Sequence, residues 1–158
     1  MIANESGGHY VEQVRPEWTD HNGHLNVAYF GLILDRATDH LFSRFGLGPE
    51  YMEARACSTF AVESYTRYFA EVLEGQEVGV SSWVFDVDDK RVRYGHEMRR
   101  LHDGVVAATF EQISLHIDMT ARKVCPWPDD IRRRLAGGAG MRAGFDKLDI
   151  QALRRSKI

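Results

Sequence analysis

The stretch Asp20-His21-Asn22-Gly23-His24-Leu25-Asn26 lies where two sequence patterns meet. Before it, apolar residues in 9–18 alternate imperfectly, as they do in a strand. After it, residues 26–45 place apolar side chains at steps of three and four, which is the period of a helix. Asn26 is a suitable N-cap for that helix. The stretch is therefore a polar loop that leads from a strand into a long apolar helix.

The rest of the chain predicts strands joined by tight turns. Alternating apolar residues predict strands at 57–69, 77–88, 91–102 and 105–117, and short helices are expected at 49–55 and 130–135. One long helix with a run of hairpins indicates an α+β fold, in which a single antiparallel sheet wraps around one central helix. The edges and outer face of such a sheet need cover, which a homodimer or a dimer of dimers would provide.

Length, charge and composition limit the classes of protein to consider. The 158 residues suit one domain, expected at 1–136, followed by a flexible glycine-rich link and a charged tail at 137–158. The formal net charge of −3 argues against a nucleic-acid-binding protein. The chain shows neither a signal peptide nor an apolar run long enough for a membrane helix, so a cytoplasmic location is expected.

The cysteines and histidines suggest neither a disulfide framework nor a metal site. Cys57 and Cys125 are the only cysteines, which fits a reducing compartment. His21 and His24 are three residues apart, but no third ligand has convincing spacing, and the cysteines are far away in sequence. We therefore expect no metal and no cofactor.

The polar residues of the loop allow a structural and a chemical interpretation. Asp, Asn and Gly are common turn formers, and Asn26 could simply cap the helix. The free N–H groups at a helix N-terminus, however, form a site for an oxyanion. A carboxylate and an imidazole beside such a site meet the needs of acyl transfer.

The pattern Asp20-x-Asn22-x-His24-x-Asn26, followed by Tyr29 and a helix, resembles the hotdog-fold acyl-CoA and acyl-ACP thioesterases. In the bacterial 4-hydroxybenzoyl-CoA thioesterase branch, the catalytic aspartate stands in an Asp-x-x-Gly setting that Asp20 matches. In the plant acyl-ACP branch, the same loop is accompanied by a glutamate at the start of the next strand, which Glu63 matches. The resemblance implies a hotdog fold, an acyl-CoA substrate and four catalytic residues, namely Asp20, Asn22, His24 and Glu63.

A second likeness concerns the thioesterases of bacterial carnitine degradation. The segments that carry it are Arg15 to His24, Ala37-Thr38-Asp39 and Val62 to Tyr68. It implies betainyl-CoA as substrate, whose quaternary ammonium is usually held by aromatic faces. The expected substrate-binding residues are Asn26, Tyr29, Trp18 and Tyr65. Alternatively, these aromatic rings fill the core or a dimer contact.

In the expected mechanism, Asp20 attacks the thioester carbonyl or activates a water molecule. N–H groups at the start of the helix stabilise the oxyanion, and Asn22 and His24 orient the water or the carboxylate. Glu63 is a second candidate base, from the same chain or a partner subunit. Arg91, Arg93 and Arg122 are candidate phosphate contacts. Alternatively, each is an ordinary surface arginine. Two other functions stay open: a hotdog hydratase or dehydratase, and a non-catalytic acyl-CoA-binding module.

Overall fold

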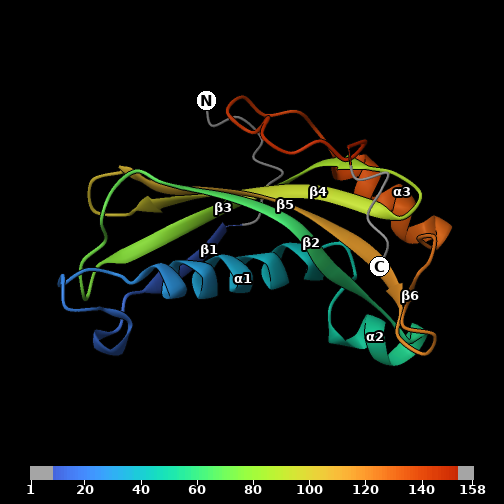
Figure 1. Ribbon diagram of the computed structural model, residues 1–158, viewed down its shortest axis with the longest axis horizontal. Helices are drawn as coiled ribbons and strands as arrows, with labels where there is room; N and C mark the ends of the chain where they lie inside the picture. Colours follow the sequence, from blue (N-terminus) through green and yellow to red (C-terminus); the bar gives the residue numbers. More distant parts are fainter. Residues whose placement is uncertain (1–8, 153–158) are drawn as a thin grey trace. The chain divides into compact units, whose positions relative to one another are not determined.

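The computed structural model describes residues 9–152 (Figure 1). Helices and strands follow one another as β1 (His9–Gln13), a 3-10 turn (Pro16–Trp18), α1 (Val27–Ser43), α2 (Pro49–Arg55), β2 (Cys57–Tyr68), β3 (Glu77–Val87), β4 (Arg91–Arg100), β5 (Val106–Asp118), β6 (Lys123–Val124) and α3 (Asp129–Gly138). No helix within residues 9–152 is long and apolar enough to span a membrane.

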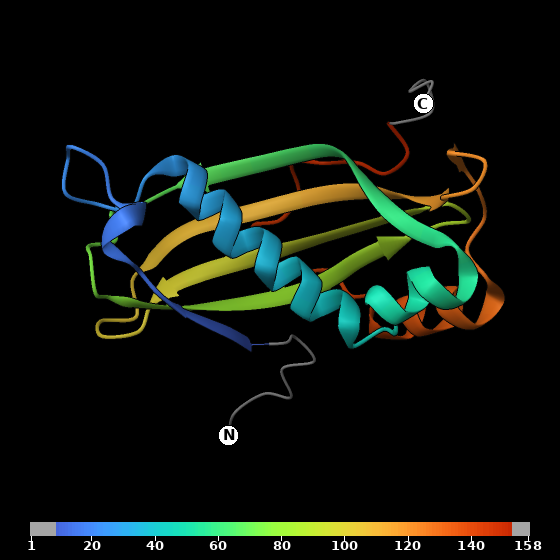
Figure 2. The same cartoon turned by 90° about the horizontal axis from the view of Figure 1, so that it is seen from below.

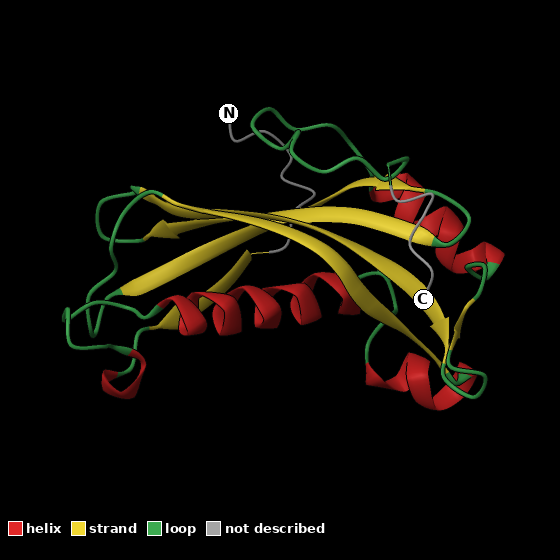
Figure 3. Ribbon diagram, viewed as in Figure 1, coloured by secondary structure: helices red, strands yellow, loops and turns green. Residues whose placement is uncertain are grey.

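The strands within residues 9–152, drawn yellow in Figure 3, form one sheet. Its order is β1-β3-β4-β5-β2, with β6 paired to β5. β1 runs antiparallel to β3, with Tyr10 opposite Val80. β6 runs antiparallel to β5, with Val124 opposite Ile117. An antiparallel sheet with few helices confirms the predicted α+β class.

The chain divides into two units, which are described separately. Within the described residues, the first unit comprises 9–41, Thr66–Ser82 and His96–Phe110. The second unit comprises Phe42–Tyr65, Trp83–Gly95 and 111–152. Most of α1 and the loop that precedes it belong to the first unit.

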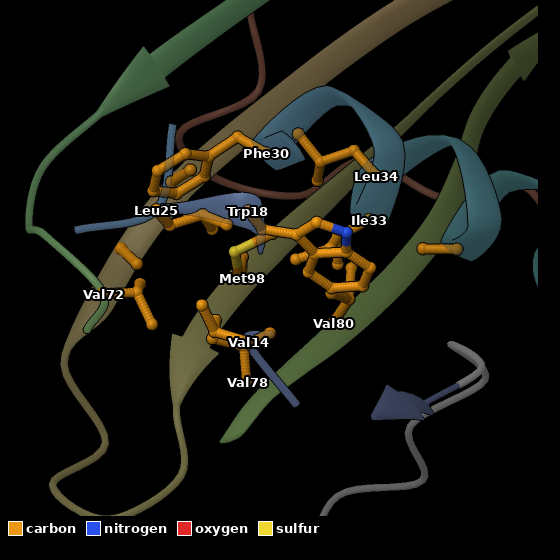
Figure 4. Packing of buried hydrophobic residues seen from close by; sticks show 13 residues of the cluster. Val14, Trp18, Leu25, Phe30, Ile33, Leu34, Val72, Val78, Val80 and Met98 are labelled. Carbon is orange, nitrogen blue, oxygen red and sulfur yellow. The ribbon is translucent and has the colours of Figure 1, made fainter. Parts of the chain in front are cut away.

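The core of the first unit lies between α1 and the strands (Figures 2 and 4). On α1, Ile33 and Ala37 are four residues apart and fully buried. They belong to the same cluster as Val80 and Met98 on the sheet. Burying a side chain of the size of Ile33 contributes about 1.5–3 kcal/mol, so this face fixes where α1 lies.

The opposite face of α1 is open in the single chain. Gly31, Asp35 and Asp39 are exposed, at the four-residue spacing that places them on one side of the helix. The expectation that the sheet encloses a central helix is therefore not confirmed by one chain. The sequence gives the reason, because Gly31, Asp35 and Asp39 interrupt the apolar residues along this side of the helix.

The second unit has its own aromatic contacts, and the segment after α3 joins them. Phe42 meets Tyr94 edge to face, with ring centroids 4.9 Å apart. Phe145 is buried and packs on Phe85 at a centroid distance of 5.0 Å. The segment that follows α3 thus contacts the sheet as an irregular strap. The division of the chain into a domain at 1–136 and a tail at 137–158 stays a prediction.

Most predicted elements are present, with shifted ends. β1 ends at Gln13 and not at Trp18, because Pro16 begins the 3-10 turn. β6 was not predicted, since a strand of two residues carries no readable alternation. α3 continues to Gly138, three residues past the predicted end.

Candidate active site in the loop before α1

Backbone hydrogen bonds hold the loop between Trp18 and α1 in place. The N–H of Leu25 donates to the Val72 carbonyl at 2.8 Å, and the N–H of Asn26 donates to the Trp18 carbonyl at 2.9 Å. Leu25 is also buried in the core cluster. The loop is therefore anchored from both sides, and its polar side chains start from a fixed backbone.

The tip of the loop is a tight turn that ends at Gly23. The N–H of Gly23 donates to the Asp20 carbonyl at 2.9 Å, and Gly23 has a φ of 76°, which favours glycine. The N–H of Asn22 donates to Asp20 Oδ1 at 2.8 Å. Asn22 thus contributes its backbone, while its side chain is exposed. The turn-forming interpretation of these residues is correct, and the turn also orients the Asp20 carboxylate.

The Asp20 carboxylate is held by donors on both oxygens. Oδ2 accepts a hydrogen bond from Asn26 Nδ2 at 3.2 Å, in addition to the bond from Asn22 to Oδ1. The Asn22 N–H, the Asn26 amide and the nearby histidines His24 and His21 hold the pKa of Asp20 below its ordinary value. Asp20 is therefore ionised at neutral pH, which suits a nucleophile or base and not a proton donor.

Asn26 links this carboxylate to the start of α1. Its Oδ1 accepts the N–H of Ala28 at 2.9 Å, so the predicted N-cap is confirmed. The N–H of Val27, the first residue of α1, donates to no protein acceptor within residues 9–152. It lies at the positive end of the helix dipole. Of the N–H groups at the start of α1, that of Val27 is therefore the one available to an anion. The sequence had predicted several such donors.

Val27 is a functional candidate that sequence reasoning did not name. The signal was present, because an Asn N-cap takes the N–H of the second or third helical residue and leaves that of the first. A backbone donor has no side-chain signature, so only the capping rule could have located it.

The imidazole of His24 contacts the backbone through one ring nitrogen. His24 Nδ1 lies 3.2 Å from the Leu25 carbonyl oxygen. A carbonyl oxygen only accepts, so this contact assigns a proton to Nδ1, and in the neutral ring Nε2 then carries the lone pair. The half-buried ring can therefore accept a hydrogen bond through Nε2.

The aromatic residues expected to contact substrate lie in different surroundings. Trp18 is only 4% exposed and belongs to the core, with Tyr29 stacked on it at a centroid distance of 5.7 Å. The Arg15 guanidinium lies 4.9 Å from the Trp18 ring centroid, so the indole already has a cation beside it. For Trp18, the alternative of a core residue is the better description. Tyr29 is only half-buried.

Glu63 and Tyr65 belong to the second unit, whereas Asp20 belongs to the first. Both residues are exposed on β2, and Tyr65 retains 39% of its accessible surface. Their participation stays a prediction.

The arginines considered for phosphate binding differ in availability. Arg93 is buried and paired with Asp86 at 2.6 Å and with Glu111 at 3.3 Å. It is therefore a structural residue, and the interpretation as a phosphate contact was wrong for it. Arg91 is paired with Asp88 at 2.5 Å.

Comparison with known proteins adds a family to this geometry. Residues 14–135 match the family model described as the thioesterase-like superfamily. The betainyl-CoA thioesterase of Pseudomonas aeruginosa is 32% identical over 126 residues, which cover 80% of this chain and 79% of that protein. An L-carnitine dehydrogenase/betainyl-CoA thioesterase of Agrobacterium fabrum is 35% identical over 75% of this chain, which corresponds to only 24% of that longer protein.

A solved structure supports the architecture. A hypothetical protein from Staphylococcus aureus, in complex with CoA, superposes with a TM-score of 0.79 at 22% identity, covering 96% of this chain and 95% of that one. At this level of identity the likeness concerns the fold alone. It confirms the expected hotdog architecture.

Proposed function

The chain belongs to the thioesterase-like superfamily, and we propose that it hydrolyses a small acyl-CoA thioester, with betainyl-CoA as the leading substrate. The observation that carries the proposal is the Asp20 carboxylate, fixed by Asn22 and Asn26 beside the start of α1. The overall reaction takes one thioester and one water to a free carboxylate, CoA thiol and a proton.

Asp20 acts first, either on the carbonyl carbon or on a water molecule. As nucleophile, its carboxylate adds to the thioester carbon, the C–S bond breaks, and water then hydrolyses the mixed anhydride. As base, it takes a proton from the water that adds to the same carbon. The lowered pKa of Asp20 supports both routes, since each requires the ionised form.

The Val27 N–H and the His24 imidazole complete the machinery. Val27 N–H is the donor that stabilises the oxyanion formed when the carbonyl is attacked. His24 accepts a hydrogen bond from the attacking water through Nε2, a role supported by its Nδ1 contact to Leu25. Asn22 and Asn26 position Asp20. Glu63 is retained as a second base, contributed by the same chain or by a partner subunit.

The substrate proposal rests on chemistry as well as on the relatives. Betainyl-CoA carries a quaternary ammonium that binds aromatic faces but cannot donate a hydrogen bond. Tyr29 and Tyr65 are the aromatic candidates, because Trp18 is buried behind Tyr29. We also propose that the protein works as a homodimer or dimer of dimers in the cytoplasm.

The test measures thiol release from a panel of acyl-CoAs. The panel pairs betainyl-CoA with 3,3-dimethylbutanoyl-CoA, which has the same shape without the charge, and adds short aliphatic and aromatic acyl-CoAs. We expect the charged substrate to have the higher kcat/KM. Failure of every acyl-CoA to release thiol above background would leave a binding module, and hydration of an enoyl-CoA without thiol release would identify a hydratase.

A variant separates the recognition of charge from the chemistry. Tyr29→Leu is expected to raise KM for betainyl-CoA about tenfold, the size of one moderate cation–π contact. KM for the neutral analogue should change much less. An equal rise for both substrates would contradict the role of Tyr29 in recognising the cation. Tyr65→Leu, assayed in the same way, tests the other candidate ring.

A further inference from the structure

The second unit brings together three side chains that commonly bind transition metals. They are Cys57 at the start of β2, His116 near the end of β5, and Cys125 just after β6. One potential ligand atom from each lies within 4.8 Å of the others. Cys125 Sγ is 3.2 Å from His116 Nδ1. The sequence did not predict this cluster, because Cys57 and Cys125 lie far in sequence from His21 and His24, the histidines considered as ligands there.

Backbone hydrogen bonds build this cluster. Pairing of β6 with β5 places Cys125 beside His116, and the N–H of Cys125 donates to the His116 carbonyl at 3.0 Å. The N–H of Met119 donates to the Ala56 carbonyl at 2.8 Å, which brings the first residue of β2 to the same place. Because these bonds do not involve the side chains, the ligands are arranged before any ion binds.

The histidine of the cluster is oriented before any ion binds. His116 is 1% exposed, so neighbouring residues fix the position of its ring. The Tyr51 hydroxyl lies 2.7 Å from Nε2. Metal-bound histidines usually have such a partner on the second nitrogen, where it orients the ring. The Trp127 ring packs against the His116 imidazole, with the two ring centroids 4.5 Å apart.

Arg55 lies near the thiols. It interacts electrostatically with Cys57, and its guanidinium is paired with Asp130 at 2.6 Å. The charged and titratable groups that face the cluster are Tyr51 and Arg55 of α2, Asp118 of β5 and Asp130 of α3. A bound cation would supply the charge that two thiolates need.

We propose that Cys57, His116 and Cys125 form a zinc site with three protein ligands and an open fourth position. Zinc prefers thiolate and imidazole ligands in tetrahedral geometry, which sets ligand atoms about 3.5 Å apart. The separations in the cluster are close to this value, with 3.2 Å between Cys125 Sγ and His116 Nδ1 and all three ligand atoms within 4.8 Å of one another. Both cysteines are partly exposed, so an ion can enter from solvent.

Binding moves protons in a defined way. Zn²⁺ forms bonds to both sulfurs, and the two thiol protons leave to solvent. Without metal, His116 Nδ1 lies 3.1 Å from the Cys125 carbonyl oxygen and donates to it. With metal, Nδ1 gives its lone pair to zinc, and the proton moves to Nε2. The Tyr51 hydroxyl can accept there as readily as it donates.

The experiment titrates reduced, metal-free protein without a polyhistidine tag. Zn²⁺ is added in competition with a chromophoric chelator, and Co²⁺ replaces it to record the thiolate-to-metal charge-transfer band. We expect one ion per chain, release of two protons per ion, and a Co²⁺ spectrum of tetrahedral type. Cys57→Ser and Cys125→Ser should each lower the charge-transfer band by about half and weaken zinc binding by at least about tenfold.

Two further variants separate the site from general effects. Tyr51→Phe keeps the ring but removes the hydroxyl, and it should weaken zinc binding about tenfold while the protein stays folded by circular dichroism. His102→Gln removes an exposed histidine elsewhere and should leave binding unchanged. The proposal is overturned if the serine variants bind zinc as tightly as the parent, if Co²⁺ gives no thiolate band, or if the cysteines form a disulfide while zinc is present.

Discussion

Asp20 forms the turn of the loop and is also the residue proposed to react. Its backbone carbonyl closes the turn to Gly23, while its carboxylate accepts from Asn22 and Asn26. The same contacts that shape the loop therefore keep the carboxylate ionised and oriented. Preparation of this kind is what a nucleophile or a base needs before substrate arrives.

Asn26 offers a test of that arrangement. In Asn26→Asp, the new carboxylate still caps Ala28, but it replaces the donor that lies 3.2 Å from Asp20 Oδ2. Repulsion between the two carboxylates should raise the pKa of Asp20. The acidic limb of the kcat/KM profile is then expected to move to higher pH, and the same repulsion should lower the free energy of unfolding at neutral pH.

Asn26→Ala is the matched control, because it removes the cap as well as the donor. It should lower the free energy of unfolding by about 1 kcal/mol. An acidic limb that stays in place in Asn26→Asp would contradict the role of Asn26 in holding Asp20 ionised.

At the scale of the elements, His96 on β4 connects α1 to the sheet within the first unit. Its Nε2 lies 2.8 Å from the Thr38 hydroxyl, and its Nδ1 lies 2.7 Å from the Ser82 hydroxyl. Burial lowers the pKa of His96 to about 3. The imidazole is therefore neutral in the folded protein, where it is one link in a hydrogen-bonded chain from helix to strand.

This histidine predicts a loss of stability in acid. Between its ordinary pKa of 6.5 and about 3, the unfolded chain binds a proton at His96 and the folded chain does not. The free energy of unfolding should thus fall as the pH drops below 6.5, by about 1.4 kcal/mol per pH unit from this group. Urea unfolding measured between pH 6.5 and about 3 should show that the free energy of unfolding declines less steeply in His96→Gln than in the parent protein. An unchanged slope would rule out His96 as the source.

The elements also show what the sequence could predict. Apolar spacing located α1 and the four long strands, because burial on one face imposes the period of the backbone. It could not predict β6 or the docking of Phe145, since these depend on neighbours that are distant in sequence. In the site, Asp20, Asn26 and His24 were named by motif. The N–H of Val27, which has no protein acceptor within residues 9–152, could have been located by the capping rule. The cluster of Cys57, His116 and Cys125 required the fold.

At the scale of the whole molecule, the segment after α3 is attached to the second unit through Glu111. This buried carboxylate accepts the N–H groups of Lys147 and Leu148 and pairs with Arg93. Arg93 in turn donates to the Phe145 carbonyl at 3.0 Å. One buried ion pair therefore fixes the strap to the sheet.

Glu111→Gln removes the charge and keeps the shape. We expect it to lower the free energy of unfolding by about 3 kcal/mol, because among the described residues Asp86 is then the remaining charged partner of the buried Arg93. Limited proteolysis should then cut within 139–150 faster than in the parent protein. Asp146→Asn changes an exposed carboxylate of the same segment and serves as the control. Equal cleavage rates in all three proteins would contradict the attachment of the strap through Glu111.

The most direct test of the proposed thioesterase site is thiol release from betainyl-CoA by the parent protein, Asp20→Asn and Asp146→Asn. The asparagine at position 20 retains the shape but can neither attack the carbonyl nor take a proton from water. We predict that kcat falls at least about 100-fold in Asp20→Asn, with an unchanged melting temperature, while Asp146→Asn keeps parental activity. Full activity in Asp20→Asn would contradict the assignment of the reaction to this loop.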